Sequence, residues 1–165
     1  LQSKSNNKIQ FDKNGENAFK GSINEIILEN FLNNSYYESK PPKTLDINDF
    51  NLAGIRGLTL EDSITTLSEL TSRTICDSLN FFKKKPLQVF LSGGGRKNKY
   101  IFERINKLSK LNIKNIDVLN IDGDFIESQA FAYLAIKSFK KKPISFPEST
   151  GVKSPSMGGI LVSSK

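Results

Sequence analysis

The chain has 165 residues, about the length of one domain, and its 37% hydrophobic and 25% charged residues are an ordinary balance for a globular protein. It contains no His, one Cys and no Trp. This excludes His-dependent nucleophilic catalysis, His-ligated metals, an internal disulfide and a Cys-rich zinc site. The net charge of +7 favours an anionic partner, such as a nucleotide or a nucleic acid.

The sequence carries no signal for a membrane. No stretch approaches the roughly 20 apolar residues of a membrane span. The first residues are polar, unlike the apolar centre of a signal peptide. We therefore expect a cytoplasmic protein without a membrane partner.

The positive charge includes two lysine runs, residues 83–85 and 140–142, each of which follows a segment with helical spacing. Lysines at such positions complement the negative end of the helix dipole, and this is the favoured interpretation. A nucleic-acid-binding patch is the alternative. No aromatic-rich recognition strand accompanies it, so nucleic acid is not the partner we expect.

The amino-terminal third is predicted to contain one helix between irregular segments. Residues 1–14 are polar and are expected to be frayed or extended. Residues 22–25 (Ser-Ile-Asn-Glu) have the form of a capping box, and the apolar spacing that follows predicts a helix up to about Asn33. Residues 34–57 are predicted to form a long irregular connection, and connections of this length are often functional.

A second and longer helix is predicted to begin after Thr59, which is a suitable N-cap and precedes acidic residues that suit the first turn. This helix is expected to end before Pro86. One side of it is apolar and carries Ile64, Leu67, Leu70, Ile75, Leu79 and Phe82. Cys76 lies next to that side, and we expect it to pack rather than to react.

The remainder alternates strands and helices, which is the pattern of a parallel α/β sheet with flanking helices. The expected elements are a strand buried on both faces at residues 87–91, a helix at 98–110, a strand at 116–119, and a helix that opens with a second capping box at 124–127. The remaining residues, 143–165, are predicted to be loop-like, with one short strand at 160–162.

The most informative local feature is the run Ser-Gly-Gly-Gly-Arg-Lys-Asn at residues 92–98, between a predicted strand and a predicted helix. The three glycines would let the backbone approach a ligand closely, and Arg96 and Lys97 add positive charge. Ligands of open α/β sheets bind beyond the carboxyl ends of strands, so a nucleotide is the natural candidate. The run is neither a P-loop nor a dinucleotide fingerprint, and a tight turn without a ligand is the alternative.

Other polar residues nearby have both a functional and a structural interpretation. Asn98 could contact a ligand or cap the helix that follows it. Glu127 could hold a sugar hydroxyl or complete the second capping box. Asp122 and Asp124 flank Gly123, and we expect Asp124 to be the helix cap and Asp122 to be a turn residue. No two carboxylates are spaced as a recognisable acid–base pair.

Six segments carry a resemblance to a known family. Residues 93–100 match a Gly-Gly-Gly-x-x-Asn motif, residues 121–135 an Asp-x-x-Glu-Ala-x-Ala-Phe-Ala-x-Leu-Ala helix, and residues 143–151 a Leu-Pro-x-x-x-Pro-x-x-Thr-Gly ending; the others are 11–18, 41–44 and 62–71. Taken in chain order, the six segments resemble the motifs of the anhydro-N-acetylmuramic acid kinases, which occur in the same order. The chain departs from the family pattern at Leu45, Ser128 and Lys142.

The resemblance implies an α/β fold. It would be an incomplete actin-like, ribonuclease H-like nucleotide-binding lobe, with a short, mainly parallel sheet and flanking helices, formed by residues 1–165 as one domain. The whole enzyme would use ATP, Mg²⁺ and water to convert 1,6-anhydro-N-acetylmuramic acid to N-acetylmuramic acid 6-phosphate in cell-wall recycling. Members of the family are about twice this long, and their Asp-Thr-Gly-Pro-Gly-Asn segment, which carries the catalytic base, is not in this sequence. The resemblance therefore implies the carboxyl-terminal lobe of a two-lobe kinase.

The resemblance also assigns roles to individual residues. Glu127 would face the sugar, and residues 150–151 would shape the floor of the cleft. ATP or ADP would be faced by Gly93, Gly94, Gly95 and Asn98. No catalytic residue is assigned to this chain, so alone it would bind nucleotide weakly and consume no ATP. The alternative is a non-catalytic nucleotide-binding or assembly module whose apolar faces promote self-association, for example into a homodimer.

Overall fold

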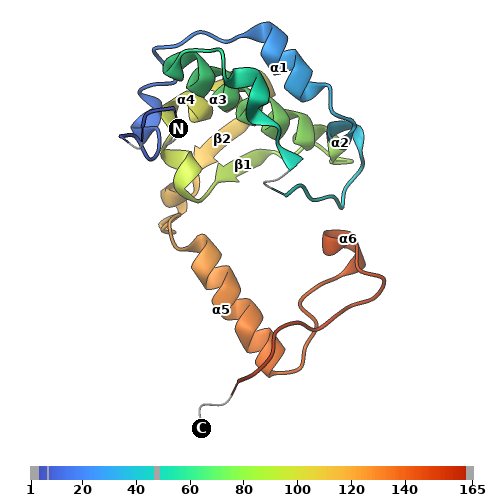
Figure 1. Cartoon of the computed structure of the whole chain (residues 1–165). Helices are drawn as coiled ribbons and strands as arrows, with labels where there is room; N and C mark the ends of the chain where they lie inside the picture. Colours follow the sequence, from blue (N-terminus) through green and yellow to red (C-terminus); the bar gives the residue numbers. More distant parts are fainter. Residues whose placement is uncertain (1–3, 7, 47–48, 163–165) are drawn as a thin grey trace.

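The computed structural model describes residues 4–6, 8–46 and 49–162. Figure 1 shows a main body formed by the elements from the amino terminus to β2, from which α5 extends. With η marking a 3₁₀ helix, the elements are η1 (Lys13–Gly15), α1 (Glu25–Leu32), α2 (Ser35–Glu38), η3 (Leu52–Ile55), α3 (Leu60–Ser78), η4 (Leu79–Phe81), β1 (Gln88–Leu91), η5 (Gly94–Lys97), α4 (Lys99–Ser109), β2 (Asn112–Asn115), η6 (Ile116–Leu119), α5 (Ile126–Phe139) and α6 (Pro147–Thr150). Among the described residues, no helix has the length and apolar character needed to cross a membrane.

The first two long helices form where the sequence predicts them, but only one of their caps is the predicted residue. Thr59 caps α3, since its Oγ1 accepts a hydrogen bond from the backbone N–H of Asp62 at 3.1 Å. The cap of α1 is Asn24 and not Ser22. The backbone N–H of Ser22 instead donates to Asp62 Oδ1 at 2.7 Å, which ties the approach to α1 onto the start of α3. The first capping box is therefore wrong, because a contact with a distant helix competes with the local one.

The core lies where α3 packs against α4 and α1. The buried side of α3 includes the predicted Ile64 and Leu70, but it also contains several polar residues: Ser63, Thr65, Thr66, Ser68, Glu69 and Ser72. The carboxylate of Glu69 is fully buried and accepts two hydrogen bonds, both of 2.6 Å, from Nε and Nη2 of Arg104 in α4. Arg73 contacts the same carboxylate at 3.1 Å and extends the network to α1. The core is therefore held by ion pairs as well as by apolar packing.

The sheet consists of two strands, which pair in parallel from Gln88 opposite Asn112 to Leu91 opposite Asn115. This confirms the predicted strand–helix–strand unit with a parallel crossover. The position of the second strand was wrong, since residues 116–119 form η6 and β2 ends before them. The first strand is half-buried and not buried on both faces, because the described residues add no further strand to the sheet.

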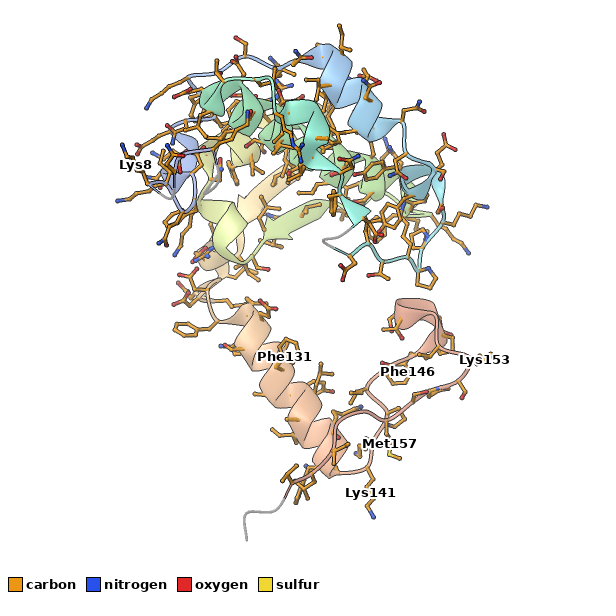
Figure 2. All side chains as sticks on the ribbon, in the orientation of Figure 1. Lys8, Phe131, Lys141, Phe146, Lys153 and Met157 are labelled. Carbon is orange, nitrogen blue, oxygen red and sulfur yellow. The ribbon has the colours of Figure 1, made fainter. Side chains whose placement is uncertain are left out.

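Helix α5 extends away from the main body, and none of its residues is buried (Figures 1 and 2). Its large apolar side chains include Phe131, Tyr133 and Phe139, which are exposed by 64%, 60% and 69%. A helix that is apolar on most of its circumference is normally covered by other structure. The described residues therefore leave a large apolar surface of α5 uncovered.

The segment after α5 turns back toward the main body. Residues Ser145 and Ser156 form an isolated antiparallel bridge, and Ser138 donates a hydrogen bond to the carbonyl of Gly158. Beyond α6, a Cβ at Gly151 would lie 3.3 Å from Cγ of Pro42, so this segment reaches the long connection between α1 and α3. The strand predicted at residues 160–162 does not form, and these residues are irregular and exposed.

Candidate functional site

The glycine run lies between β1 and α4, at the carboxyl end of the strand, as the sequence predicts. Gly93 has a φ of 74°, in the left-handed region that favours glycine. Its backbone N–H donates to the carbonyl of Gly123 at 2.9 Å. The turn therefore explains why position 93 is a glycine, and the bond to Gly123 holds this turn against the segment before α5.

Neither backbone conformation nor lack of space requires glycine at the next two positions. Gly94 and Gly95 are exposed, neither has a positive φ, and a Cβ at either position would meet no atom within 4 Å. As the first residues of η5, they have backbone N–H groups without a partner inside that helix. Side chains at these positions would occupy open space in front of the loop, where a ligand could otherwise approach the backbone.

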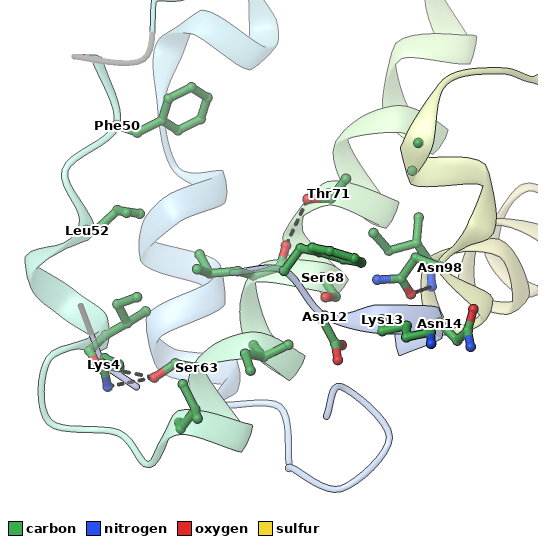
Figure 3. Close-up of a pocket in the computed structure, with 18 of the residues that line it drawn as sticks. Lys4, Asp12, Lys13, Asn14, Phe50, Leu52, Ser63, Ser68, Thr71 and Asn98 are labelled. Carbon is green, nitrogen blue, oxygen red and sulfur yellow. Dashed lines mark hydrogen bonds between the residues drawn. The ribbon is translucent and has the colours of Figure 1, made fainter. Parts of the chain in front are cut away.

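This loop forms one rim of a cavity of about 1070 Å³ (Figure 3). Gly94, Gly95, Lys97 and Asn98 line the cavity, whereas Gly93 does not. Much of the remaining wall is apolar and comes from α3 and the segment that leads into it, through Phe50, Leu52, Ile55, Leu60, Ile64 and Leu67. Binding pockets for small molecules fall in the range of roughly 300–1,000 Å³, so the cavity has room for a nucleotide.

Two other charged side chains that line the cavity, Asp12 and Lys4, are already engaged by the protein. Asp12 Oδ1 accepts from the backbone N–H and Nδ2 of Asn17 at 2.8 and 2.9 Å, and its Oδ2 accepts from the N–H of Ala18 at 3.0 Å. Lys4 Nζ donates to two backbone carbonyls, both at 2.6 Å, and to Oγ of Ser63 at 2.7 Å. Asp12 therefore has a structural role as a hydrogen-bond acceptor. Lys4 holds the segment before α3 in place through its hydrogen bonds (Figure 3).

Arg96, which the sequence analysis treats as added positive charge, is buried. Its Nε and Nη2 donate to the two oxygens of Asp117 at 2.6 and 2.9 Å, and its Nη1 donates to Asp124 Oδ1 at 2.5 Å and to the carbonyl of Gly93 at 3.0 Å. These hydrogen bonds raise the pKa of Arg96 and lower the pKa of Asp117 to about 2. The guanidinium therefore has little left to offer a phosphate.

The second capping box, like the first, is wrong. Asp124 does not cap α5, because its carboxylate accepts from Arg96 and, at 2.5 Å, from Nζ of Lys97. Both cations lower the pKa of Asp124. Asp122 is a turn residue as predicted, since its Oδ1 accepts from the backbone N–H of Asp124 at 2.9 Å.

The two remaining predicted site residues differ in their relation to the cavity. Asn98 caps α4, with its Oδ1 accepting from the backbone N–H of Ile101 at 3.1 Å, and it lines the cavity at the same time. Its Nδ2 is the atom that could reach a ligand. Glu127 lies in the first turn of the exposed α5, among the lining residues of neither described cavity. Glu127 therefore does not line the cavity that the glycine loop borders.

Several residues of the site carry no local signal in the sequence. Asp117 falls inside the segment predicted as a strand, and Gly123 reads as an ordinary turn residue. The apolar cavity wall at residues 50–55 belongs to the long connection, whose length is the one available signal. Within the described residues, no group of three or more Asp, Glu or Cys side chains is placed to hold a metal ion.

Comparisons with known proteins identify the family. Residues 2–163 match the family model described as anhydro-N-acetylmuramic acid kinase. A protein of that name from Pelagibacter ubique is 45% identical over 162 residues, covering 94% of this chain and 43% of the relative. Its counterpart from Methylorubrum extorquens is 39% identical over 153 residues, covering 92% and 40%.

A third relative with the same name, from Zymomonas mobilis, is 33% identical over 153 residues, covering 93% of this chain and 42% of its own length. The chain thus spans about two-fifths of the length of these curated relatives. The family model covers nearly all of the chain, and the motifs that first carried the resemblance lie within the match. The chain therefore belongs to the anhydro-N-acetylmuramic acid kinase family.

Proposed function

We propose that this chain supplies the nucleotide-binding part of a kinase that converts 1,6-anhydro-N-acetylmuramic acid to N-acetylmuramic acid 6-phosphate with ATP and water. The observation that carries the proposal is the pair Gly94 and Gly95, which line a large cavity although the fold gives no reason for glycine there. The backbone N–H groups of this loop would meet the nucleotide, with the apolar wall as a surface for its base.

The sugar chemistry would depend on the part of the enzyme that the relatives have beyond the matched region. The engaged carboxylate of Asp12 supports this division of labour. So does Asp62, whose pKa is lowered mainly by the hydrogen bond from the backbone N–H of Ser22. Neither is free to act as the base that activates water. Glu127 is exposed on α5, where its carboxylate is available to the sugar in the complete enzyme.

Mg²⁺ would offset the charge of the transferred phosphoryl group. The carboxylates beside the glycine loop do not fit this ion. Asp117 and Asp124 already accept hydrogen bonds from Arg96, and Asp124 also accepts from Lys97. We therefore assign no ligand of Mg²⁺ to this chain and derive no step through the ion.

The proposal is tested by titrating the ¹⁵N-labelled chain with ADP and Mg²⁺ and following the amide signals by NMR. We expect shifts centred on residues 94–98. In Gly94→Ala and Gly95→Ala, binding should weaken by at least about tenfold while the spectrum stays dispersed, because the methyl group blocks the ligand and not the fold. Gly57→Ala is the matched control, since Gly57 also has open space around its Cβ position and does not line the cavity.

A dispersed spectrum that does not respond to millimolar ADP would overturn nucleotide binding by this chain. So would alanine variants that bind ADP as tightly as the wild type. Consumption of ATP by this chain in the presence of the anhydro sugar would overturn the assignment of the catalytic base to another part of the enzyme.

A non-catalytic assembly module is the second candidate function, and the exposed apolar surface of α5 is the observation that favours it. Self-association into a homodimer would cover that surface in the isolated chain. Light scattering after size-exclusion chromatography tests this. A monomer at all concentrations would exclude it.

A further inference from the structure

We propose that Arg96 is a positioning residue: its guanidinium holds the glycine loop in one conformation and connects that loop to the start of α5. This inference rests on the proposed nucleotide site and adds a residue whose effect on the ligand is indirect. It depends on four contacts of one buried side chain, which join segments that are distant in the sequence.

The first part of the argument concerns the loop. The side chain of Arg96 is 4% exposed, and its Nη1 donates back to the carbonyl of Gly93 at the beginning of the same loop. The planar fork of an arginine holds a carboxylate in a fixed orientation when both nitrogens are engaged, as they are here with Asp117. A loop that is rich in glycine has many accessible conformations, so it gains order from such a clamp.

The second part concerns what Arg96 does not do. An arginine beside a glycine loop invites the interpretation that it binds phosphate. Here four of its five N–H donors have protein acceptors, and three carboxylates lie within 4 Å of the guanidinium, at 2.5, 2.6 and 3.8 Å. To bind phosphate, the side chain would have to abandon these partners and leave them unpaired. Its role is therefore to shape the backbone that meets the ligand.

The third part concerns α5. Asp124 stands two residues before the first residue of α5, and it receives hydrogen bonds from both Arg96 and Lys97. The backbone bond from Gly93 to Gly123 joins the same two segments. A change in the loop on ligand binding would therefore be transmitted to the beginning of α5, which is the helix that leads away from the main body.

The test compares three variants with the wild-type chain. Arg96→Lys keeps the charge but removes the fork. Asp124→Asn weakens the connection to α5 and leaves the pair with Asp117 intact. Arg73→Lys is the matched control, because Arg73 also contacts several carboxylates but lies away from the cavity. Two measurements are made: ¹⁵N order parameters of residues 94–97 without ligand, and ADP titrations that follow residues 94–98 and 126–128.

We expect Arg96→Lys to lower the order parameters of the loop from about 0.85 to below about 0.6 and to weaken ADP binding by about tenfold or more. In Asp124→Asn, we expect the order parameters of the loop to stay at about 0.85 and the affinity for ADP to stay within about threefold of the wild type. The ligand-induced shifts at residues 126–128 should shrink by more than about half, since the backbone bond from Gly93 to Gly123 remains. Arg73→Lys should lower the unfolding temperature but change neither the order parameters of the loop nor the affinity for ADP. This control separates positioning by Arg96 from a general loss of stability.

Unchanged order parameters in Arg96→Lys would overturn the positioning role, whether or not the chain binds ADP. Shifts of wild-type size at residues 126–128 in Asp124→Asn would overturn the connection to α5 through Asp124. A wild-type chain with an ordered loop that does not respond to ADP would overturn the proposed function instead. The order parameters in the absence of ligand would still decide whether Arg96 holds the loop.

Discussion

Gly123 lies directly against the guanidinium of Arg96, so that a Cβ at position 123 would overlap Nε and Cζ of the arginine. Gly123 is buried and its φ is not positive, so the requirement for glycine is space and not backbone conformation. We predict that Gly123→Ala displaces the arginine and destabilises the fold by about 1–3 kcal/mol, the usual cost of overpacking. Urea unfolding measures the loss.

Gly57→Ala again serves as the control, because it adds the same methyl group in open space. Its free energy of unfolding should stay within about 0.5 kcal/mol of the wild type. Equal stability of Gly123→Ala and the wild type would contradict the close packing of Arg96 under this turn.

Glu69 is the buried centre of the network that joins α1, α3 and α4. In Glu69→Gln the volume is kept, but the charge that faces Arg104 and Arg73 is lost. We predict a loss of about 2–4 kcal/mol in the free energy of unfolding, because two partly buried cations lose their common partner. Glu29→Gln removes a contact of Arg73 from a side chain that is 66% exposed, and it should cost less than about 1 kcal/mol. Similar losses in the two variants would show that the burial of Glu69 does not increase its contribution to the free energy of unfolding.

The stability of the chain should depend on pH through Asp117. Hydrogen bonds from Arg96 lower the pKa of this carboxyl from 3.8 to about 2. A lowered folded-state pKa stabilises the fold above the unfolded value, and that contribution is lost as the pH falls from about 4 toward 2. The difference in unfolding free energy between the wild type and Asp117→Asn should therefore shrink across this window. A difference that is constant between pH 5 and 2 would contradict the coupling.

Exposed aromatic residues of α5 should contribute little to the stability of the chain. We predict that Phe131→Ser with Phe139→Ser changes the free energy of unfolding by less than about 0.5 kcal/mol, since neither ring is buried. The same pair should reduce any self-association seen by light scattering. Ile64→Ala in the core is the comparison and should cost about 2–4 kcal/mol. A large loss from the α5 pair would mean that this helix is packed in solution.

Cys76 should behave as a packing residue. Its thiol is half-buried, and its pKa is raised, chiefly by burial and also by the charge of Asp77. Alkylation by iodoacetamide at pH 8 should therefore be about tenfold slower in the folded chain than in urea, because little thiolate is present. Equal rates in the two conditions would show that the thiol is free and accessible.

The periodicity and the glycine run were sufficient to predict α1, α3, α4 and α5, the parallel crossover from β1 to β2, and the loop that lines the cavity. These elements follow from local spacing and local backbone chemistry, which a sequence displays directly. The family was predicted separately, from the resemblance of six ordered segments to its members, and the comparisons confirm it. The roles of Gly94, Gly95 and Asn98 toward a nucleotide, and of Glu127 toward a sugar, stay predictions.

Only the tertiary structure decided three features: the caps of α1 and α5, the position of β2, and the partners of Arg96. Ser22 donates to Asp62, 40 residues away, and Arg96 pairs with Asp117 and Asp124, which are 21 and 28 residues away. A capping box also offers a carboxylate to a backbone N–H, so the local and the distant hydrogen bonds are of the same chemical kind. The packing of segments that are far apart in the sequence decides which of them forms. A sequence shows which residues can donate or accept, but only the tertiary structure shows which of them come together.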